Sequence, residues 1–328
     1  MSPSLSGVKA LALGCLFLLA AGGIPAAEQP PAGYELALVD LDGTKQVLGT
    51  LPPSVFAPRL SPDGKRVAFE LEEPRLENQP AKQPTDQLPT MRLWVADIEQ
   101  LDKRRAFPLV GNGRNWAAVW STSGDRLVFV ASADVAGRKD SLYWRRADGT
   151  GEAEHLIDAR AAEGIYANDQ QLAFITLTGN RDYGISVMDM KTKAVARLID
   201  YPGSEQHSSR VSPDGRWITY VSNETGQQEV WLEPLPQTGQ RVRVTKTGGR
   251  HPLWSPDGTH LFYDQGGRMY RVRLSLAASP PVVGDPETLP IRGFQQGDLR
   301  RQFDLMPDGK RLLMLFPLPA GATLSGRP

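Results

Sequence analysis

The chain has 328 residues, 40% of them apolar, with 37 basic and 37 acidic side chains. This length is enough to bury a large core, and the balanced charge argues against a nucleic-acid partner, whose phosphates would favour a basic face. The only cysteine is Cys15, which excludes an internal disulfide and a thiolate zinc site.

The first 27 residues have the pattern of a secretory signal peptide. Lys9 precedes an apolar run over residues 10–21, and small residues ending at Ala27 lead into a polar Glu-Gln-Pro sequence. The run is shorter than the ~20 residues of a membrane-spanning helix. The sequence therefore predicts a periplasmic or secreted protein without a transmembrane segment in its mature chain. Lipidation at Cys15, within a Leu-Gly-Cys sequence, is the alternative.

A proline-rich lead-in over residues 28–33 is followed by a predicted strand from Tyr34 to Asp40. The sequence Asp-Leu-Asp-Gly-Thr at 40–44 resembles the nucleophile motif of haloacid dehalogenase-type phosphatases. The same Asp-Gly-Thr follows a strand again at 148–150, and no amphipathic helix is apparent. A hairpin turn is therefore the favoured interpretation.

The sequence SPDGKRVAF at 61–69 returns along the chain, with small changes at 212–220, 255–263 and 306–314 and as weaker copies at 121–129 and 166–174. Proline fixes φ early in a tight turn, glycine supplies a left-handed residue, and the alternation that follows predicts a half-buried strand. The last residues of successive copies are 60, 45, 46, 43 and 51 positions apart, a period typical of the four-stranded blades of a β-propeller.

The two ends of the repeat region each supply half a blade. The last copy has no third or fourth strand after it, whereas residues 34–50 provide a third and a fourth strand without a first or second. We therefore predict an all-β, six-bladed β-propeller over 34–316, closed by strands from both termini and followed by a tail at 317–328. Such closure removes the open sheet edge.

The spacing of 60 residues between the first two copies is long because residues 72–90 are inserted between two strands of the first complete blade. The insertion holds four prolines and has no apolar period, which indicates a solvated loop.

A six-unit ring of SPDG repeats behind a signal peptide resembles the propeller of the TolB family of the periplasm and the wider group of WD40-like Pro-Asp repeats. The resemblance implies a monomeric binding platform for an envelope protein or peptide. TolB proteins carry an α/β domain ahead of the propeller, and here only the lead-in separates the signal peptide from the first strand. The repeat also occurs in prolyl-oligopeptidase-type peptidases and oligogalacturonate lyases, so it indicates the fold more than the function.

Catalytic motifs are scarce. The chain has no Gly-x-Ser-x-Gly elbow and no phosphate-binding loop, so we predict no catalytic residue and no cofactor. A non-enzymatic role is preferred, although the sequence does not exclude an enzyme.

The first strand of each propeller blade lines the central channel, so residues at its start converge at one mouth of the ring. The position five residues before a turn copy holds Phe56, Trp116, His207, Arg250 and Arg301, and His251 follows Arg250. We predict that this mouth binds an acidic segment of another envelope protein. Two alternatives stay open: solvated loop residues, or a polysaccharide-lyase type enzyme with a metal on His207 and His251.

Overall fold

A computed structural model describes residues 30–73, 90–111, 114–132, 140–158, 161–168, 170–178, 182–297 and 299–322. The chain divides into a unit ending at Pro30 and a unit from Pro31 onward, and the second unit holds every described strand. The predicted signal peptide and Cys15 lie outside the described residues. Within the described ranges, no helix is long and apolar enough to cross a membrane.

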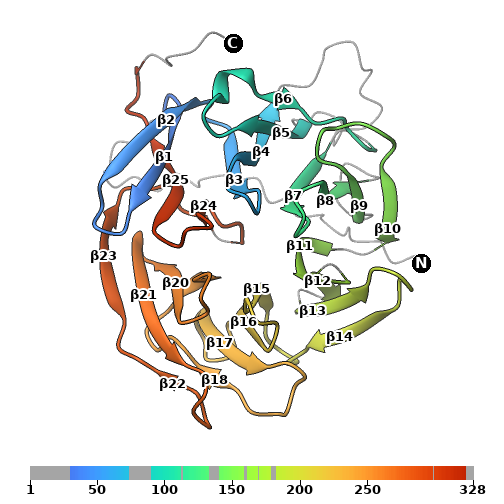
Figure 1. Cartoon of the computed structure of the whole chain (residues 1–328), viewed down its shortest axis with the longest axis vertical. Helices are drawn as coiled ribbons and strands as arrows, with labels where there is room; N and C mark the ends of the chain where they lie inside the picture. The colour runs from blue at the N-terminus through green and yellow to red at the C-terminus, as the bar shows by residue number, and fades with distance from the viewer. Residues whose placement is uncertain are drawn as a thin grey trace, which may run out of the picture. The chain divides into compact units, whose positions relative to one another are not determined.

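The second unit is built from six antiparallel sheets arranged around a central axis (Figure 1). Five of them follow one another along the chain, each beginning with its innermost strand. Blade I contains β3 (Val55–Leu60), β4 (Arg66–Glu73), β5 (Thr90–Asp97) and β6 (Arg105–Ala106). Blade II contains β7 (Asn115–Trp120), β8 (Arg126–Ser132), β9 (Asp140–Arg146) and β10 (Glu154–Asp158). Blade III contains β11 (Ala161–Asn168), β12 (Gln171–Thr178), β13 (Asp182–Asp189) and β14 (Val195–Ile199). Blade IV contains β15 (Gln206–Val211), β16 (Trp217–Ser222), β17 (Glu229–Pro234) and β18 (Val242–Arg243). Blade V contains β19 (Arg250–Trp254), β20 (His260–Gln265), β21 (Arg268–Ser275), β22 (Val282–Val283) and β23 (Glu287–Arg292).

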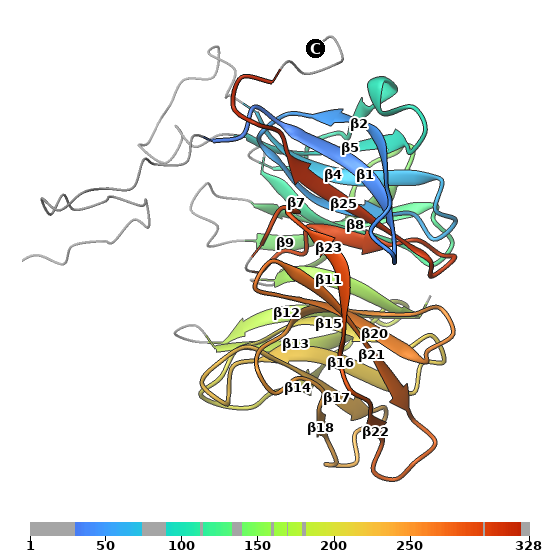
Figure 2. The same ribbon diagram turned by 90° about the vertical axis from the view of Figure 1, so that its left-hand side faces the viewer.

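Blade VI is assembled from the two ends of the unit, and the predicted ring closure is confirmed. Its strands run in the order β2 (Lys45–Leu51), β1 (Tyr34–Asp40), β25 (Arg311–Pro317) and β24 (Phe303–Leu305). Strand β1 pairs with β25 from Tyr34 opposite Pro317 to Asp40 opposite Arg311, and Figure 2 shows the two side by side. Residues 34–39 of β1 therefore have a paired strand on both sides, as ring closure requires.

The SPDG sequence forms the turn between the first and second strands of its blade. In blade I the Gly64 N–H donates to the Ser61 carbonyl over 2.8 Å, and Gly64 has φ of +70°. The Ser61 hydroxyl donates to the Asp63 carboxylate over 2.5 Å, which lowers the pKa of Asp63. The same backbone bond and left-handed glycine recur at Gly124, Gly215, Gly258 and Gly309. The predicted turn chemistry is thus present in five blades.

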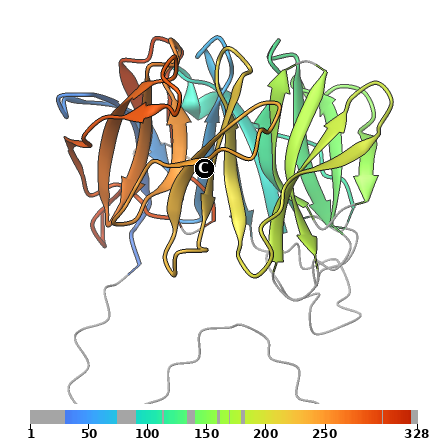
Figure 3. The same cartoon turned by 90° about the horizontal axis from the view of Figure 1, so that it is seen from below.

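These turns gather on one face of the ring, hereafter the turn face, and the links between successive blades lie on the opposite face, hereafter the link face. Figure 3 views the ring from the side, with the strands running between the two faces. Neighbouring turns touch: a Cβ on Gly309 would lie 2.8 Å from Pro256 Cδ, and one on Gly64 would lie 2.9 Å from Pro307 Cδ. Among the described residues, a Cβ on Gly215 would meet nothing within 4 Å. In sequence, blade III has Ala167 where blades I, IV, V and VI have the turn proline.

The core consists of six apolar clusters, one at each junction between neighbouring blades. Phe69 packs against blade VI while the preceding Ala68 packs against blade II, and both are fully buried. The prediction of half-buried second strands is therefore wrong. Each blade is covered on both faces by its neighbours, so both sets of alternating residues leave the solvent.

Two local interpretations can be compared with the structure. Residues 40–44 close the hairpin between β1 and β2, with the Gly43 N–H donating to the Asp40 carbonyl over 2.9 Å, so the hairpin interpretation is confirmed. The inserted loop is shorter than 72–90, because Glu73 of β4 pairs with Thr90 of β5. The remainder, 74–89, lies outside the described residues.

Candidate functional site

Four of the predicted site residues occupy equivalent places at the link-face end of the inner strands. Phe56, Trp116, His207 and Arg250 each precede a residue with left-handed backbone: Ala57, Ala117, Ser208 and His251 have φ between +50° and +54°. The strand ladder shifts register at each of these points. The repeated irregularity is a β-bulge, which re-aims the side chains around it.

Three of the six predicted site residues are buried. His207 and His251 are each 2% exposed and Arg301 is 4% exposed. The Arg301 guanidinium turns inward and donates to the Phe303 carbonyl over 2.6 Å and to Asp304 over 3.0 Å. These three side chains are therefore not exposed at the mouth of the ring, where the sequence analysis placed them, because the neighbouring residues of the ring cover them.

His251 belongs to a buried charge cluster in blade V. Its Nδ1 lies 2.8 Å from Asp264 Oδ1, and Arg250 Nη2 lies 3.7 Å from the second oxygen of the same carboxylate. Asp264 is 1% exposed, and a buried carboxylate requires such partners. Arg250 keeps 22% of its side chain exposed, so it alone presents this cluster to solvent.

A second arginine, Arg300, which neighbours the predicted Arg301, also lies at the link face. Its Nη1 lies 2.5 Å from Glu70 Oε2, and its guanidinium lies 4.7 Å from the centre of the Trp116 ring. The other oxygen of Glu70 accepts the Ala117 N–H over 2.8 Å. Arg300 enters from the blade VI side, Glu70 belongs to blade I and Trp116 to blade II, so three blades meet at this contact.

The sequence analysis did not select Glu70 and Asp264, although their position in the repeat could have identified both. Each directly follows the last residue of its turn copy, where the other copies have apolar residues: Val130, Ile175, Val221 and Leu315. An acidic residue in a strand that is buried on both faces needs a specific partner. Glu70 and Asp264 therefore indicate that blades I and V have a charged group near the link-face end of their inner strands.

An exposed apolar side chain accompanies Arg300. Among the described residues, the large apolar side chains that are more than two-fifths exposed are Val47, Val195, Val282 and Leu299. The first three lie on the outermost strands β2, β14 and β22, where scattered exposure is ordinary. Leu299 lies in the link that leads into β24, directly before Arg300.

The two histidines proposed as metal ligands have separate partners. His207 Nδ1 lies 3.0 Å from the Ser208 hydroxyl, whereas His251 contacts Asp264. Within the described ranges, no group of three or more His, Cys, Asp or Glu side chains is placed to hold a metal ion.

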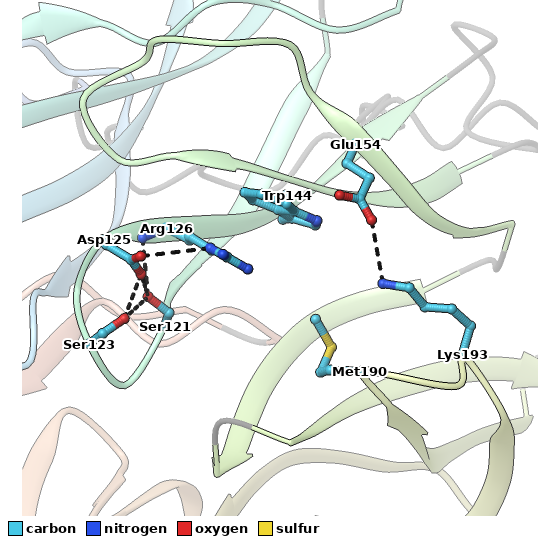
Figure 4. Close-up of a pocket in the computed structure, with 8 residues that line it drawn as sticks. All are labelled: Ser121, Ser123, Asp125, Arg126, Trp144, Glu154, Met190 and Lys193. Carbon is cyan, nitrogen blue, oxygen red and sulfur yellow. Dashed lines mark hydrogen bonds and ion pairs between the residues drawn. The ribbon is translucent and has the colours of Figure 1, made fainter.

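Cavities also open on the turn face. One of about 370 Å³ lies between blades II and III and is shown in Figure 4. Another, of about 450 Å³, lies between blades IV and V. Volumes of this size fit small-molecule sites.

Comparison with known proteins identifies the fold. No family model matches the sequence. Dipeptidyl aminopeptidase BIII of Pseudoxanthomonas mexicana is 28% identical over 106 residues, which are 30% of this chain and 15% of that protein. Putative TolB from Agrobacterium tumefaciens superposes with a TM-score of 0.66 at 17% identity, over 88% of this chain and 99% of that one.

Two further structures share the fold. TolB from Acinetobacter baumannii has a TM-score of 0.54 at 17% identity, covering 87% of this chain and 63% of that one. An oligogalacturonate lyase in complex with manganese has a TM-score of 0.55 at 16% identity, covering 87% and 83%. The chain therefore has the fold of the TolB-type six-bladed propeller, and the resemblance inferred from its repeats is confirmed at that level. It spans less than two-thirds of the Acinetobacter TolB and a small part of the curated peptidase.

Proposed function

We propose that the chain is an exported, monomeric and non-enzymatic propeller of the cell envelope that binds an acidic segment of another protein at its link face. Residues 1–27 are the signal peptide in this proposal. The observation that carries it is the contact of Arg300 with Trp116 and Glu70, because this contact holds an arginine and an aromatic ring together at the place where three blades meet.

The energetic argument starts from Glu70, a carboxylate that is 1% exposed. Its bonds to Arg300 and to the Ala117 N–H orient the guanidinium before any partner arrives, which reduces the conformational entropy lost on binding. Arg300 keeps 29% of its side chain exposed. A carboxylate of the partner can therefore accept a charge-assisted hydrogen bond from it.

The neighbouring side chains fit a protein partner. Tryptophan and arginine are among the residues that most often anchor interfaces. Leu299, the residue directly before Arg300, is an apolar residue that is 43% exposed. Arg250 supplies a second cation from blade V. The resemblance to TolB propellers supports a protein ligand in preference to a small substrate, and the manganese-bound lyase of the same fold supports the enzyme alternative.

The test is affinity capture from an envelope extract with the tagged full chain, followed by binding measurements with the purified partner. Leu299→Asp changes an exposed residue and should weaken binding at least tenfold, or about 1.4 kcal/mol, without changing the melting temperature. Arg300→Ala should weaken binding by a similar factor, with some loss of stability because Glu70 stays buried without its cation.

Arg311→Ala is the matched control. Arg311 is also partly exposed and paired with an acid, Asp308, at 3.0 Å, but it lies beside a turn on the opposite face. Its replacement should leave the affinity unchanged. Full binding by both Leu299→Asp and Arg300→Ala would contradict the proposed site, and stoichiometric manganese binding that depends on His207 and His251 would favour the enzyme alternative.

A further inference from the structure

Equivalent arginines in blades I and II have different surroundings on the turn face. Arg66 lies over the Trp120 ring at 4.6 Å, and its Nη2 donates to the Gly124 carbonyl of the blade II turn over 2.5 Å. Arg126 holds the same position in its own repeat and lies over the Trp144 ring at 4.1 Å. Arg66 thus links the turns of blades I and II through its hydrogen bond to the Gly124 carbonyl.

Arg126 has no corresponding hydrogen bond among the residues that the structure describes. Blade III has Ala-Asn-Asp at 167–169 in place of Pro-Asp-Gly. Among the residues that the structure describes, the Arg126 guanidinium donates no hydrogen bond, and its Nε lies 3.7 Å from Asp125 Oδ2. Stacking on Trp144 nevertheless holds it in place. A planar set of donors is therefore oriented with no acceptor at hydrogen-bonding distance in the described part of the chain.

These donors face the cavity between blades II and III. The cavity has a volume of about 370 Å³ and is lined by Ser121, Ser123, Asp125, Arg126, Trp144, Glu154, Met190 and Lys193. Figure 4 shows Met190 across the cavity from Arg126 and Trp144, with Glu154 and Lys193 at one end. Lys193 Nζ lies 3.5 Å from Glu154 Oε1. The walls thus offer apolar surface in the middle and a cation on either side.

We propose that this cavity binds a small organic carboxylate with an apolar body. The Arg126 guanidinium donates hydrogen bonds to the ligand carboxylate, because its N–H groups lie in one plane and match the two carboxylate oxygens. Trp144 and Met190 contact the apolar body, and Lys193 adds a second cation. This site is independent of the link-face function proposed above.

The two acidic side chains of the cavity leave room for such a ligand. Asp125 Oδ1 already accepts hydrogen bonds from Ser121 over 2.9 Å and from Ser123 over 2.5 Å. Glu154 is 51% exposed and its lysine partner 39% exposed, and ion pairs of this kind contribute little. A ligand carboxylate can therefore replace Glu154 as the neighbour of Lys193.

The experiment uses three ring compounds of similar size: benzoate, neutral benzamide and cationic benzylammonium. Binding to the full chain is measured by ligand-observed NMR and calorimetry. We expect benzoate to bind and benzylammonium not to bind. Arg126→Ala should weaken benzoate binding roughly tenfold or more, and Arg126→Lys should not restore it, because an ammonium lacks the planar fork. Arg311→Ala, at the equivalent position of blade VI, is the control and should bind benzoate normally.

The variant Glu154→Gln tests whether the cavity prefers an anionic or a cationic ligand. Removing this carboxylate should tighten benzoate binding roughly threefold, since a like charge is removed and Lys193 loses a competitor. Weaker binding of benzoate by Glu154→Gln, or preferential binding of benzylammonium, would overturn the proposal in favour of a cation site. It is also overturned if benzoate does not bind at about 10 mM, or if Arg126→Ala binds it as well as the unchanged chain does. Melting curves verify that each variant is folded.

Discussion

The contact between neighbouring turns can be tested by placing alanine at two glycines that differ in one respect. Gly309 and Gly215 occupy the same turn position, with φ of +68° and +72°. At Gly309 a Cβ would lie 2.8 Å from Pro256 Cδ and 3.3 Å from Pro256 Cγ, whereas at Gly215 it would meet none of the described atoms within 4 Å. The pair therefore separates backbone strain from the clash between blades.

Gly215→Ala should cost about 1–2 kcal/mol, the penalty of a left-handed backbone for a residue with a Cβ. Gly309→Ala carries the same penalty and in addition about 1–3 kcal/mol for overpacking against a rigid proline ring. The gain from restricting the unfolded chain is common to both and cancels. The free energy of unfolding should therefore be lower for Gly309→Ala than for Gly215→Ala by about 1–3 kcal/mol.

Urea unfolding followed by tryptophan fluorescence measures this difference. With an m value of about 3 kcal/mol/M, the midpoint of Gly309→Ala should lie roughly 0.3–1 M below that of Gly215→Ala. Pro256→Ala added to Gly309→Ala should recover part of the loss, because it removes the atoms that the new Cβ meets, and the double-mutant cycle gives the coupling. Equal midpoints for the two single variants would refute the reasoning that neighbouring turns are in tight contact.

Two further predictions concern ring closure and the turns. Deleting residues 34–50 removes β1 and β2 and exposes β25 as an open edge, so the truncated chain should aggregate or melt far below the full chain; an unchanged melting curve would show that closure contributes nothing. Ser255 donates to Asp257 over 2.5 Å and is the main cause of a pKa of about 2 for Asp257. Because 3.8 is the ordinary value, this stabilisation is present above about pH 4 and is lost as the pH falls towards 2. Ser255→Ala should therefore lower the urea midpoint more at pH 7 than at pH 2, and an equal loss at both values would assign the effect to packing.

The sequence by itself determined the repeat, the number of blades and the way the ring closes. This was possible because the Pro-Asp-Gly turn is local chemistry: it needs a proline φ, a carboxylate within reach of the Ser61 hydroxyl and a left-handed Gly64, all within four residues. The half blades at the two ends follow from counting strands. The hairpin at residues 40–44 could also be assigned, since the same turn occurs twice.

Burial was decided by the tertiary structure. The alternation after each turn predicts one buried face, but Ala68 and Phe69 are both fully buried because blades cover both faces of every second strand. The same cause accounts for His207 and His251, which lie at the expected strand position and are nevertheless 2% exposed. Sequence spacing locates a residue along a strand, whereas exposure depends on what the neighbouring blade places against it.

Arg300 and Arg301 show most clearly that sequence spacing does not determine which side chain is exposed. Counting back from the turn selects Arg301, which bonds to Phe303 and Asp304 of the strand that follows it. Arg300 reaches Glu70 and Trp116, residues about two hundred positions away in the sequence. Which of two adjacent arginines faces the solvent depends on these distant partners, because a buried carboxylate takes the nearest cation that can neutralise it.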